Sequence, residues 1–226
     1  MASWPHSRLT ALQRDVLRGF VAREQGFYLT GGGALAGFHL GHRTTDDLDL
    51  FTADPAAFAR GGHVLEAVAS ELGATLEVRQ DAPLFRRFVL TRGDGGLVID
   101  LVCDRLGGAA SDRPDHDGAR VDTPETILAN KLTTIIGRSE ERDLIDVLFL
   151  ERAGFRVEDA LAAALAKDGG CTPATLAWIL SEVSIPDGAR LPADVDPAPL
   201  RAFIADLVKR LRRAALPPDP PTSSSP

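Results

Sequence analysis

The stretch 30–51 contains two neighbouring features that together could carry out phosphate chemistry. A short β-like segment ends in a run of glycines that includes Gly31 and Gly32, and a helical pattern begins there. Backbone N–H groups can approach a phosphate closely at such a helix start. Asp47 and Asp49 follow, and strand alternation would place both carboxylates on one face. Because Mg²⁺ is the usual cation between two such carboxylates, the pattern predicts metal-assisted phosphoryl or nucleotidyl transfer.

The same stretch has other interpretations. A run of glycines alone is most often a turn, and the acidic residues around Asp47 could belong to a solvated loop. The glycine spacing also imitates a dinucleotide-binding fingerprint, with Asp49 near the position of the ribose-binding acid. However, a helix precedes the glycine segment, and the distance to the next strand is too short for a full βαβ crossover. Since the glycines and the acids are adjacent, we favour the metal and phosphate interpretation.

Asp100 is a single carboxylate inside the apolar β-like run 97–103. A buried carboxylate without a partner is costly, so Asp100 needs either a partner in the core or a metal ion. We expect it to share the metal ion with Asp47 and Asp49.

Lys131 is one of only three lysines, against 22 arginines, and lies within the apolar arc of the helix expected at 124–137. A lysine at the edge of such an arc can extend its ammonium group to water. The alternative is an ammonium directed at phosphates. On this view Lys131→Met should cost activity and little stability. Asp143 lies on the next helix, where Arg138 and Arg142 could either form salt bridges or bind phosphate.

The elements that must position these residues change in type along the chain. We expect helices at 9–21, 34–40 and 54–72, and strands at 27–29, 48–51, 75–79, 84–91 and 97–103. After residue 121 the pattern is helical, at 124–137, 140–152, 157–167, 173–183 and 198–215. The sequence therefore predicts an α/β core at 1–122, a helical region at 123–216 that completes the site, and a disordered tail at 217–226.

Composition narrows the class of protein. The 226 residues carry a net charge of −7, which argues against a general nucleic-acid coat. A local basic face could still dock RNA on the helix at 198–215, although a solvated helix is the simpler interpretation; its cations are Arg201, Lys209, Arg210, Arg212 and Arg213. Two cysteines, no apolar leader and no long apolar run predict a reduced, cytoplasmic protein without a membrane segment.

Residues 27–152 resemble the nucleotidyltransferase toxins of the abortive-infection AbiEii/AbiGii type, in the DNA polymerase β-like superfamily. The most specific part of the resemblance is GHRTTDDLDLF at 41–51. It implies an α+β fold, in which a polymerase β-like mixed sheet with helices precedes a helical C-terminal half. Gly31 and Gly32 match the family's phosphate turn, and Asp47 and Asp49 match its metal pair.

The resemblance also implies a function. We expect Mg²⁺-dependent transfer of a nucleoside monophosphate from an NTP to an acceptor hydroxyl, on RNA such as tRNA, by a toxin encoded with an antitoxin. The expected catalytic residues are Asp47, Asp49, Asp100, Lys131 and Asp143. The expected metal ligands are Asp47, Asp49 and Asp100, and the expected nucleotide-binding residues are Gly31, Gly32, Thr45, Lys131, Arg138 and Arg142. The alternatives are an aminoglycoside-type enzyme acting on a small molecule and a non-catalytic nucleotide-binding module.

Overall fold

The computed structural model describes residues 8–216 and separates into two compact units, Met1–Ile127 and Leu128–Pro226. The boundary falls inside helix α4 (Pro124–Gly137). The domain limits predicted from the sequence stay a prediction, and the tail predicted at 217–226 lies outside the described residues.

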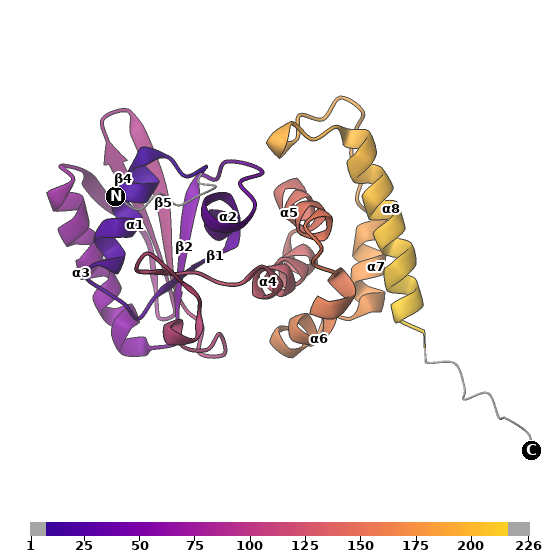
Figure 1. Ribbon diagram of the computed structural model, residues 1–226, viewed down its shortest axis with the longest axis horizontal. Helices are drawn as coiled ribbons and strands as arrows, with labels where there is room; N and C mark the ends of the chain where they lie inside the picture. The colour runs from indigo at the N-terminus through magenta and orange to yellow at the C-terminus, as the bar shows by residue number, and fades with distance from the viewer. Residues whose placement is uncertain (1–7, 217–226) are drawn as a thin grey trace, which may run out of the picture. The chain divides into compact units, whose positions relative to one another are not determined.

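The first unit is built on a five-stranded sheet with the strand order β1-β2-β5-β4-β3 (Figure 1). β2 and β5 are parallel and the other neighbours are antiparallel, so the expected mixed sheet of an α+β fold is confirmed. The strands are β1 (Tyr28–Thr30), β2 (Asp47–Thr52), β3 (Thr75–Ala82), β4 (Phe85–Arg92) and β5 (Gly95–Cys103). A second, two-stranded sheet of β6 (Asp115–His116) and β7 (Ala119–Arg120) was not predicted.

Helices α1 (Ala11–Val21) and α3 (Pro55–Glu71) lie on the same side of this sheet (Figure 1). Local sequence explains where they begin. Thr10 and Gln13 form a capping box at the start of α1, while the Asp54 side chain caps α3 and Pro55 occupies its first turn. The side chains of Leu48, Leu50, Ile99 and Leu101 are buried in the core of this unit. Because side chains alternate along a strand, Asp47, Asp49 and Asp100 belong to the opposite face.

The glycine segment differs from the expected turn followed by a helix at 34–40. The glycines themselves form the first turn of α2 (Gly31–Ala34), which continues as a π-helical turn at Leu35–His39. Thr30, just before the glycines, is anchored through its hydroxyl, which donates to buried Asp122 at 2.7 Å. Arg113 donates to the other oxygen of Asp122, also at 2.7 Å. This buried cluster fixes the point at which the chain leaves β1 for the glycine segment.

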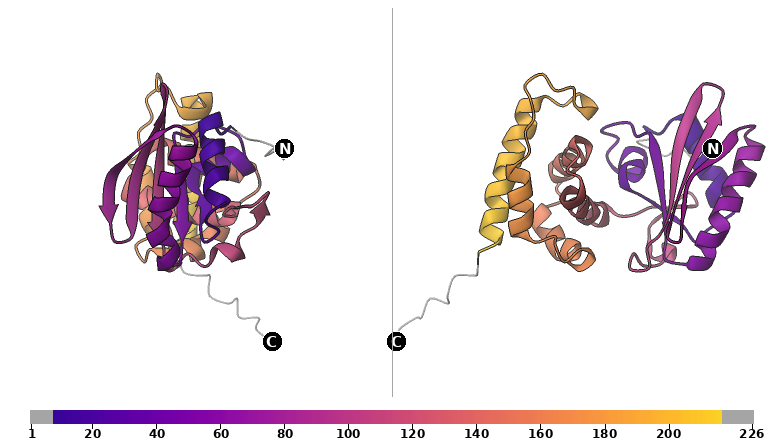
Figure 2. Two further views of the ribbon diagram at one scale, coloured as in Figure 1. Left: turned by 90° about the vertical axis from the view of Figure 1, so that its left-hand side faces the viewer. Right: turned by 180° about the vertical axis from the view of Figure 1, so that it is seen from behind.

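The second unit is helical, as predicted for the C-terminal half. After α4 it contains α5 (Glu141–Arg152), α6 (Val157–Lys167), α7 (Pro173–Ser181) and α8 (Pro197–Ala214). α7 and α8 lie side by side (Figure 2). Arg210 links α8 to two other helices, because it pairs with Glu151 on α5 and Glu158 on α6. Among residues 8–216, no helix is both long and apolar enough to cross a membrane.

Candidate functional site

Asp47 and Asp49 lie on β2, two residues apart, and both are partly exposed. The structure thus confirms that they share one face of a strand. Thr45 orients the first of them, because its hydroxyl donates to Oδ1 of Asp47 at 2.6 Å. Thr45 is itself buried, and its carbonyl accepts a 2.7 Å hydrogen bond from the side chain of Gln13. The predicted site residue Thr45 is therefore in contact with the carboxylate pair.

Gly31 and Gly32 lie directly against these residues. A Cβ atom on Gly31 would come within 2.5 Å of Oδ2 of Asp49, and the backbone of Gly31 has φ +61°, which L side chains rarely adopt. A Cβ atom on Gly32 would lie 3.0 Å from Oγ1 of Thr45. Gly31 is thus needed twice, for its backbone conformation and for the close approach of Asp49, whereas Gly32 is needed only because its surroundings are crowded.

Asp100 is in register with Asp49 on the neighbouring strand, so the structure brings the three predicted carboxylates to one face. Asp100 also has a protein partner, which is the alternative to a shared metal ion that the sequence left open. Arg87 on β4 donates to both oxygens of Asp100, with Nε–Oδ1 at 2.8 Å and Nη2–Oδ2 at 2.6 Å. Asp100 is buried, and this bidentate ion pair neutralises its charge.

Arg87 is a site residue that the sequence analysis missed, although the sequence contains its signal. The turn at Gly93 and Asp94 closes the hairpin so that Arg92 faces Gly95. Counting back along both strands from this turn places Arg87 opposite Asp100. Hydrogen bonding to Asp100 is the main cause that raises the pKa of Arg87, burial partly offsets it, and the charges of Asp47 and Asp49 add to the rise. Arg87 therefore lies in the field of all three carboxylates.

These residues fit a divalent cation only in part. In residues 8–216, no group of three or more His, Cys, Asp or Glu side chains is arranged to hold a metal ion, so Asp100 as a third ligand beside Asp47 and Asp49 stays a prediction. In this structure the Asp100 carboxylate is engaged by Arg87. Asp47 and Asp49 still suit Mg²⁺, which is commonly bound by one or two carboxylates together with water and substrate phosphates.

The second unit holds the other predicted residues, around Lys131. Its Nζ lies 2.7 Å from Oδ1 of Asp143 and 2.7 Å from Oδ2 of Asp146. Lys131 is 7% exposed, and Asp143 and Asp146 are fully buried. Burial would lower the pKa of Lys131, but the charges of Asp146 and Asp143 outweigh it and raise the pKa above its usual value. Asp146 was not among the predicted site residues, although its position three residues after Asp143 puts both on one side of α5.

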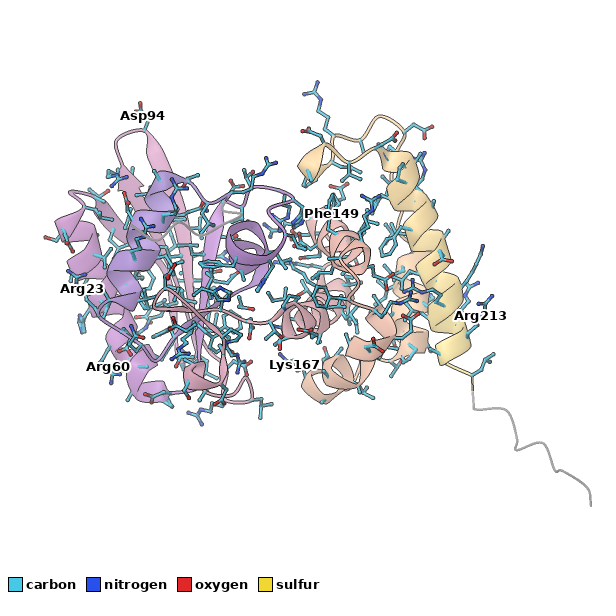
Figure 3. All side chains as sticks on the ribbon, in the orientation of Figure 1. Arg23, Arg60, Asp94, Phe149, Lys167 and Arg213 are labelled. Carbon is cyan, nitrogen blue, oxygen red and sulfur yellow. The ribbon has the colours of Figure 1, made fainter. Side chains whose placement is uncertain are left out.

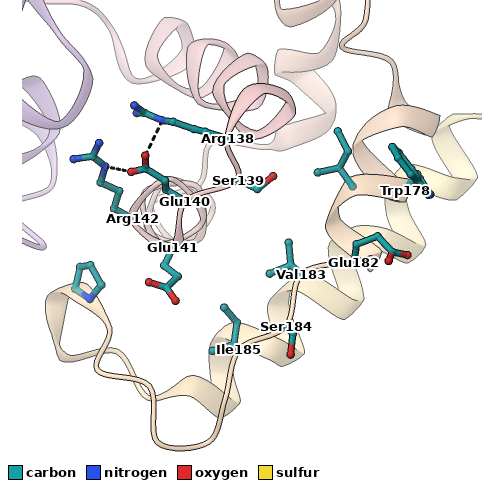
Figure 4. A pocket seen from close by; sticks show the side chains of 12 residues that line it. Arg138, Ser139, Glu140, Glu141, Arg142, Trp178, Glu182, Val183, Ser184 and Ile185 are labelled. Atoms are coloured by element: carbon teal, nitrogen blue, oxygen red, sulfur yellow. Dashed lines mark ion pairs between the residues drawn. The ribbon is translucent and has the colours of Figure 1, made fainter.

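Arg138 and Arg142 also have acidic partners in this unit. Nε of Arg138 lies 3.2 Å from Asp143 and 3.6 Å from Glu140, and Nε of Arg142 lies 2.6 Å from Glu140. Both arginines line a groove of about 680 Å³ that the exposed Trp178 also borders (Figure 4). The contacts match the salt-bridge interpretation of Arg138 and Arg142, and their role in nucleotide binding stays a prediction.

The basic face that the last helix could offer to RNA is smaller than its sequence indicates. Arg210 is held by Glu151 at 2.5 Å and Glu158 at 2.8 Å, and Arg201 pairs with Asp187 at 2.6 Å. Three of the five cations are exposed, namely Lys209, Arg212 and Arg213, the last of which is marked in Figure 3. The structure therefore favours a helix whose arginines stabilise the unit over a dedicated RNA face.

Comparison with known proteins gives a family and a fold. The family model described as nucleotidyl transferase AbiEii toxin, type IV toxin–antitoxin system, matches residues 15–221. JHP933 from Helicobacter pylori has a similar structure, with a TM-score of 0.58 and 19% identity over 89% of this chain and 91% of that chain. MenT4, a nucleotidyltransferase toxin from Mycobacterium tuberculosis H37Rv, is also similar in structure. Its TM-score is 0.58, with 15% identity over 90% of this chain and 85% of that chain. No curated protein matches the chain in sequence.

Proposed function

The chain belongs to the AbiEii family of nucleotidyltransferase toxins of type IV toxin–antitoxin systems, and we propose that it transfers a nucleoside monophosphate to a hydroxyl group of RNA. Membership implies a nucleoside triphosphate as substrate and a cognate antitoxin. We further propose that transfer depends on Mg²⁺, that tRNA is the acceptor, and that the protein acts in the cytoplasm, where NTPs and tRNA are found together.

One observation carries the proposal for the chemistry. Asp47 and Asp49 share a face of β2, Gly31 lets the Asp49 carboxylate lie close against the backbone, and Thr45 orients Asp47. Paired carboxylates on one face are what a metal-assisted attack on a triphosphate requires. A divalent cation bound there would stabilise negative charge on the phosphates during transfer.

In the reaction, the acceptor oxygen attacks the α-phosphorus, the bond to the β-phosphate oxygen breaks, and pyrophosphate leaves. The hydroxyl proton goes to a general base, for which we propose the Asp100 carboxylate. The Asp47 and Asp49 carboxylates would hold the cation, and we propose that the backbone at Gly31 and Gly32 contacts the phosphates. We also propose that four residues of the second unit contribute to transfer, namely Lys131, Asp143, Arg138 and Arg142. Substituting each of them alone tests its contribution to the rate of transfer.

The proposal is tested by labelling. The protein is incubated with each of the four α-³²P-labelled NTPs and Mg²⁺, and with total RNA, purified tRNA or a panel of aminoglycosides as acceptor. We expect label in tRNA and release of pyrophosphate, with neither in EDTA or with Asp47→Asn. Label in small acceptors alone would favour the aminoglycoside-type alternative. Absence of pyrophosphate with every NTP and acceptor would contradict catalysis itself.

A further inference from the structure

Three charged residues form one row across the sheet of the first unit. Arg87 on β4 is the register partner of Asp100 on β5, and Asp100 is the register partner of Asp49 on β2. Residues paired in register point to the same face, so one guanidinium and two carboxylates follow each other across three strands. Asp47 joins this face two residues before Asp49.

The two ends of the Arg87–Asp100 ion pair differ in their freedom to move. The Asp100 side chain is 8% exposed, whereas the Arg87 side chain is 46% exposed. A buried carboxylate cannot lose its partner without a large cost, because a charge in the core must be paired. The half-exposed guanidinium, by contrast, can turn on its flexible stem toward another anion at the surface. Arg87 is therefore the member of the pair that can change its partner.

Two chemical requirements oppose each other at Asp100. As a general base or a metal ligand, its carboxylate must be accessible, yet the bidentate pair occupies both of its oxygens. A divalent cation between Asp47, Asp49 and Asp100 would also meet the positive charge of Arg87. A triphosphate beside this face would attract the guanidinium, which matches phosphate oxygens as well as it matches a carboxylate.

We propose that Arg87 is the counter-cation that takes the place of the divalent metal on Asp100 in the metal-free protein, and that it moves to the triphosphate when metal and nucleotide bind. This inference rests on the proposed function. It makes Arg87 a substrate-binding residue that releases the Asp100 carboxylate only when the triphosphate is present. In the metal-free protein, Arg87 prevents an unpaired charge in the sheet.

The proposal predicts opposite effects of Arg87→Met on two ligands. Without nucleotide, Arg87→Met should bind Mn²⁺ at least about fivefold more tightly than the wild type, because a competing cation is removed. Electron paramagnetic resonance measures this affinity. With Mn²⁺ saturating, binding of inorganic triphosphate followed by calorimetry should become at least about fivefold weaker, because a phosphate ligand is removed. Methionine keeps the stem that lies near Phe85, whose ring centre is 5.5 Å from the guanidinium carbon.

Arg86→Met is the matched control. Arg86 is the adjacent residue on β4 and belongs to the opposite face, where it pairs with exposed Asp81 at 2.8 Å. The change in net charge is identical, so both affinities should stay at wild-type values. If Arg87→Met unfolds, Arg87→Lys keeps the charge with a weaker single contact. That variant should bind Mn²⁺ more tightly than the wild type.

Unchanged Mn²⁺ affinity in Arg87→Met and Arg87→Lys would overturn the proposal, as would unchanged or tighter triphosphate binding in Arg87→Met. Lack of Mn²⁺ binding by every variant would overturn it too. None of these measurements involves turnover. A wild-type protein that fails to label any acceptor would therefore contradict the proposed function without deciding the role of Arg87.

Discussion

The ammonium group of Lys131 lies 2.7 Å from Oδ1 of Asp143, and both side chains are buried. A second carboxylate, that of Asp146, lies 2.7 Å from the same nitrogen. The Lys131 ammonium group is therefore held between two aspartates, and Nε of Arg138 lies 3.2 Å from the other oxygen of Asp143, Oδ2. Two cations thus balance two buried carboxylates, although only Lys131 is itself buried, since the Arg138 side chain is 48% exposed.

This balance changes the expected effect of Lys131→Met. The helical pattern alone suggests little loss of stability, because methionine would fill the apolar arc. The structure instead predicts a loss of about 3–5 kcal/mol in the free energy of unfolding, because two buried carboxylates lose their shared cation. Urea unfolding measures this loss. Lys167→Met is the control, since Lys167 is exposed and its substitution should change stability by less than about 0.5 kcal/mol.

Stability and activity can be separated at this position. In Lys131→Met with Asp146→Asn, one of the two carboxylates is removed and Asp143 keeps Arg138, so the double variant should recover part of the lost stability. If this stabilised variant still labels no acceptor, Lys131 acts in the reaction. Wild-type labelling by the double variant would limit Lys131 to a structural role.

Gly31→Ala should be more destabilising than a glycine substitution at the same backbone angle elsewhere. Gly73 is the matched control, because its φ of +60° nearly equals the +61° of Gly31, yet nothing lies within 4 Å of its Cβ position. Both alanines carry a conformational cost of roughly 1–2 kcal/mol. Only the Gly31 variant also collides with Asp49, for an additional cost of about 1–3 kcal/mol. Equal losses in urea unfolding would mean that Asp49 moves aside freely.

Asp47→Asn and Asp49→Asn should leave the metal-free fold intact and remove its response to ligand. Asparagine keeps an oxygen that accepts the Thr45 hydroxyl at position 47, and each change removes one negative charge from a face that carries three carboxylates. Mg²⁺ and NTP at 100 times Kd should stabilise the wild type by about 2.7 kcal/mol and the variants much less. Thermal melting with and without these ligands measures the difference.

The hairpin-tip variant Asp94→Asn, which changes the same charge at a distant exposed position, should respond like the wild type (Figure 3). A lower melting temperature of both site variants in EDTA, together with no ligand-dependent rise in the wild type, would contradict a metal site at this pair.

The sequence predicts the elements well because their patterns are strong. The alternation at Asp47–Thr52 and the helical spacing at Pro124–Gly137 each locate an element to within about a residue. The two-residue strands β6 and β7 escape prediction because two residues carry no periodicity. The glycine segment differs from the expected turn followed by a helix at 34–40. A chain that enters a helix through a residue at positive φ, as at Gly31, resembles a turn in sequence.

Pairs between distant residues are the main part of the site that sequence patterns leave open. Lys131 in an apolar arc indicates a buried or directed cation, but its helical position does not reveal that Asp146 shares it. Asp100 inside an apolar strand indicates that a partner is needed, and only the hairpin register identifies that partner as Arg87. Charge and burial thus predict where a partner must exist, and the register of the strands decides which residue it is.

Acid should selectively remove the contribution of Glu151 to stability. Burial alone would raise the pKa of Glu151, but hydrogen bonds from Arg210 and from the backbone N–H of Val157 outweigh it and lower the pKa below its usual value. A folded-state pKa below the unfolded value means that the stabilisation is present above about pH 4.3 and is lost as the pH falls through the folded-state pKa. Glu151→Gln should therefore unfold at lower urea concentration than the wild type at pH 7, and the difference should shrink below about pH 4.

Glu71→Gln, at the exposed ion pair with Arg23, should show no comparable difference at either pH. A difference between Glu151→Gln and wild type that stays constant from pH 7 to pH 3 would show that the Arg210 pair does not depend on the charge of Glu151.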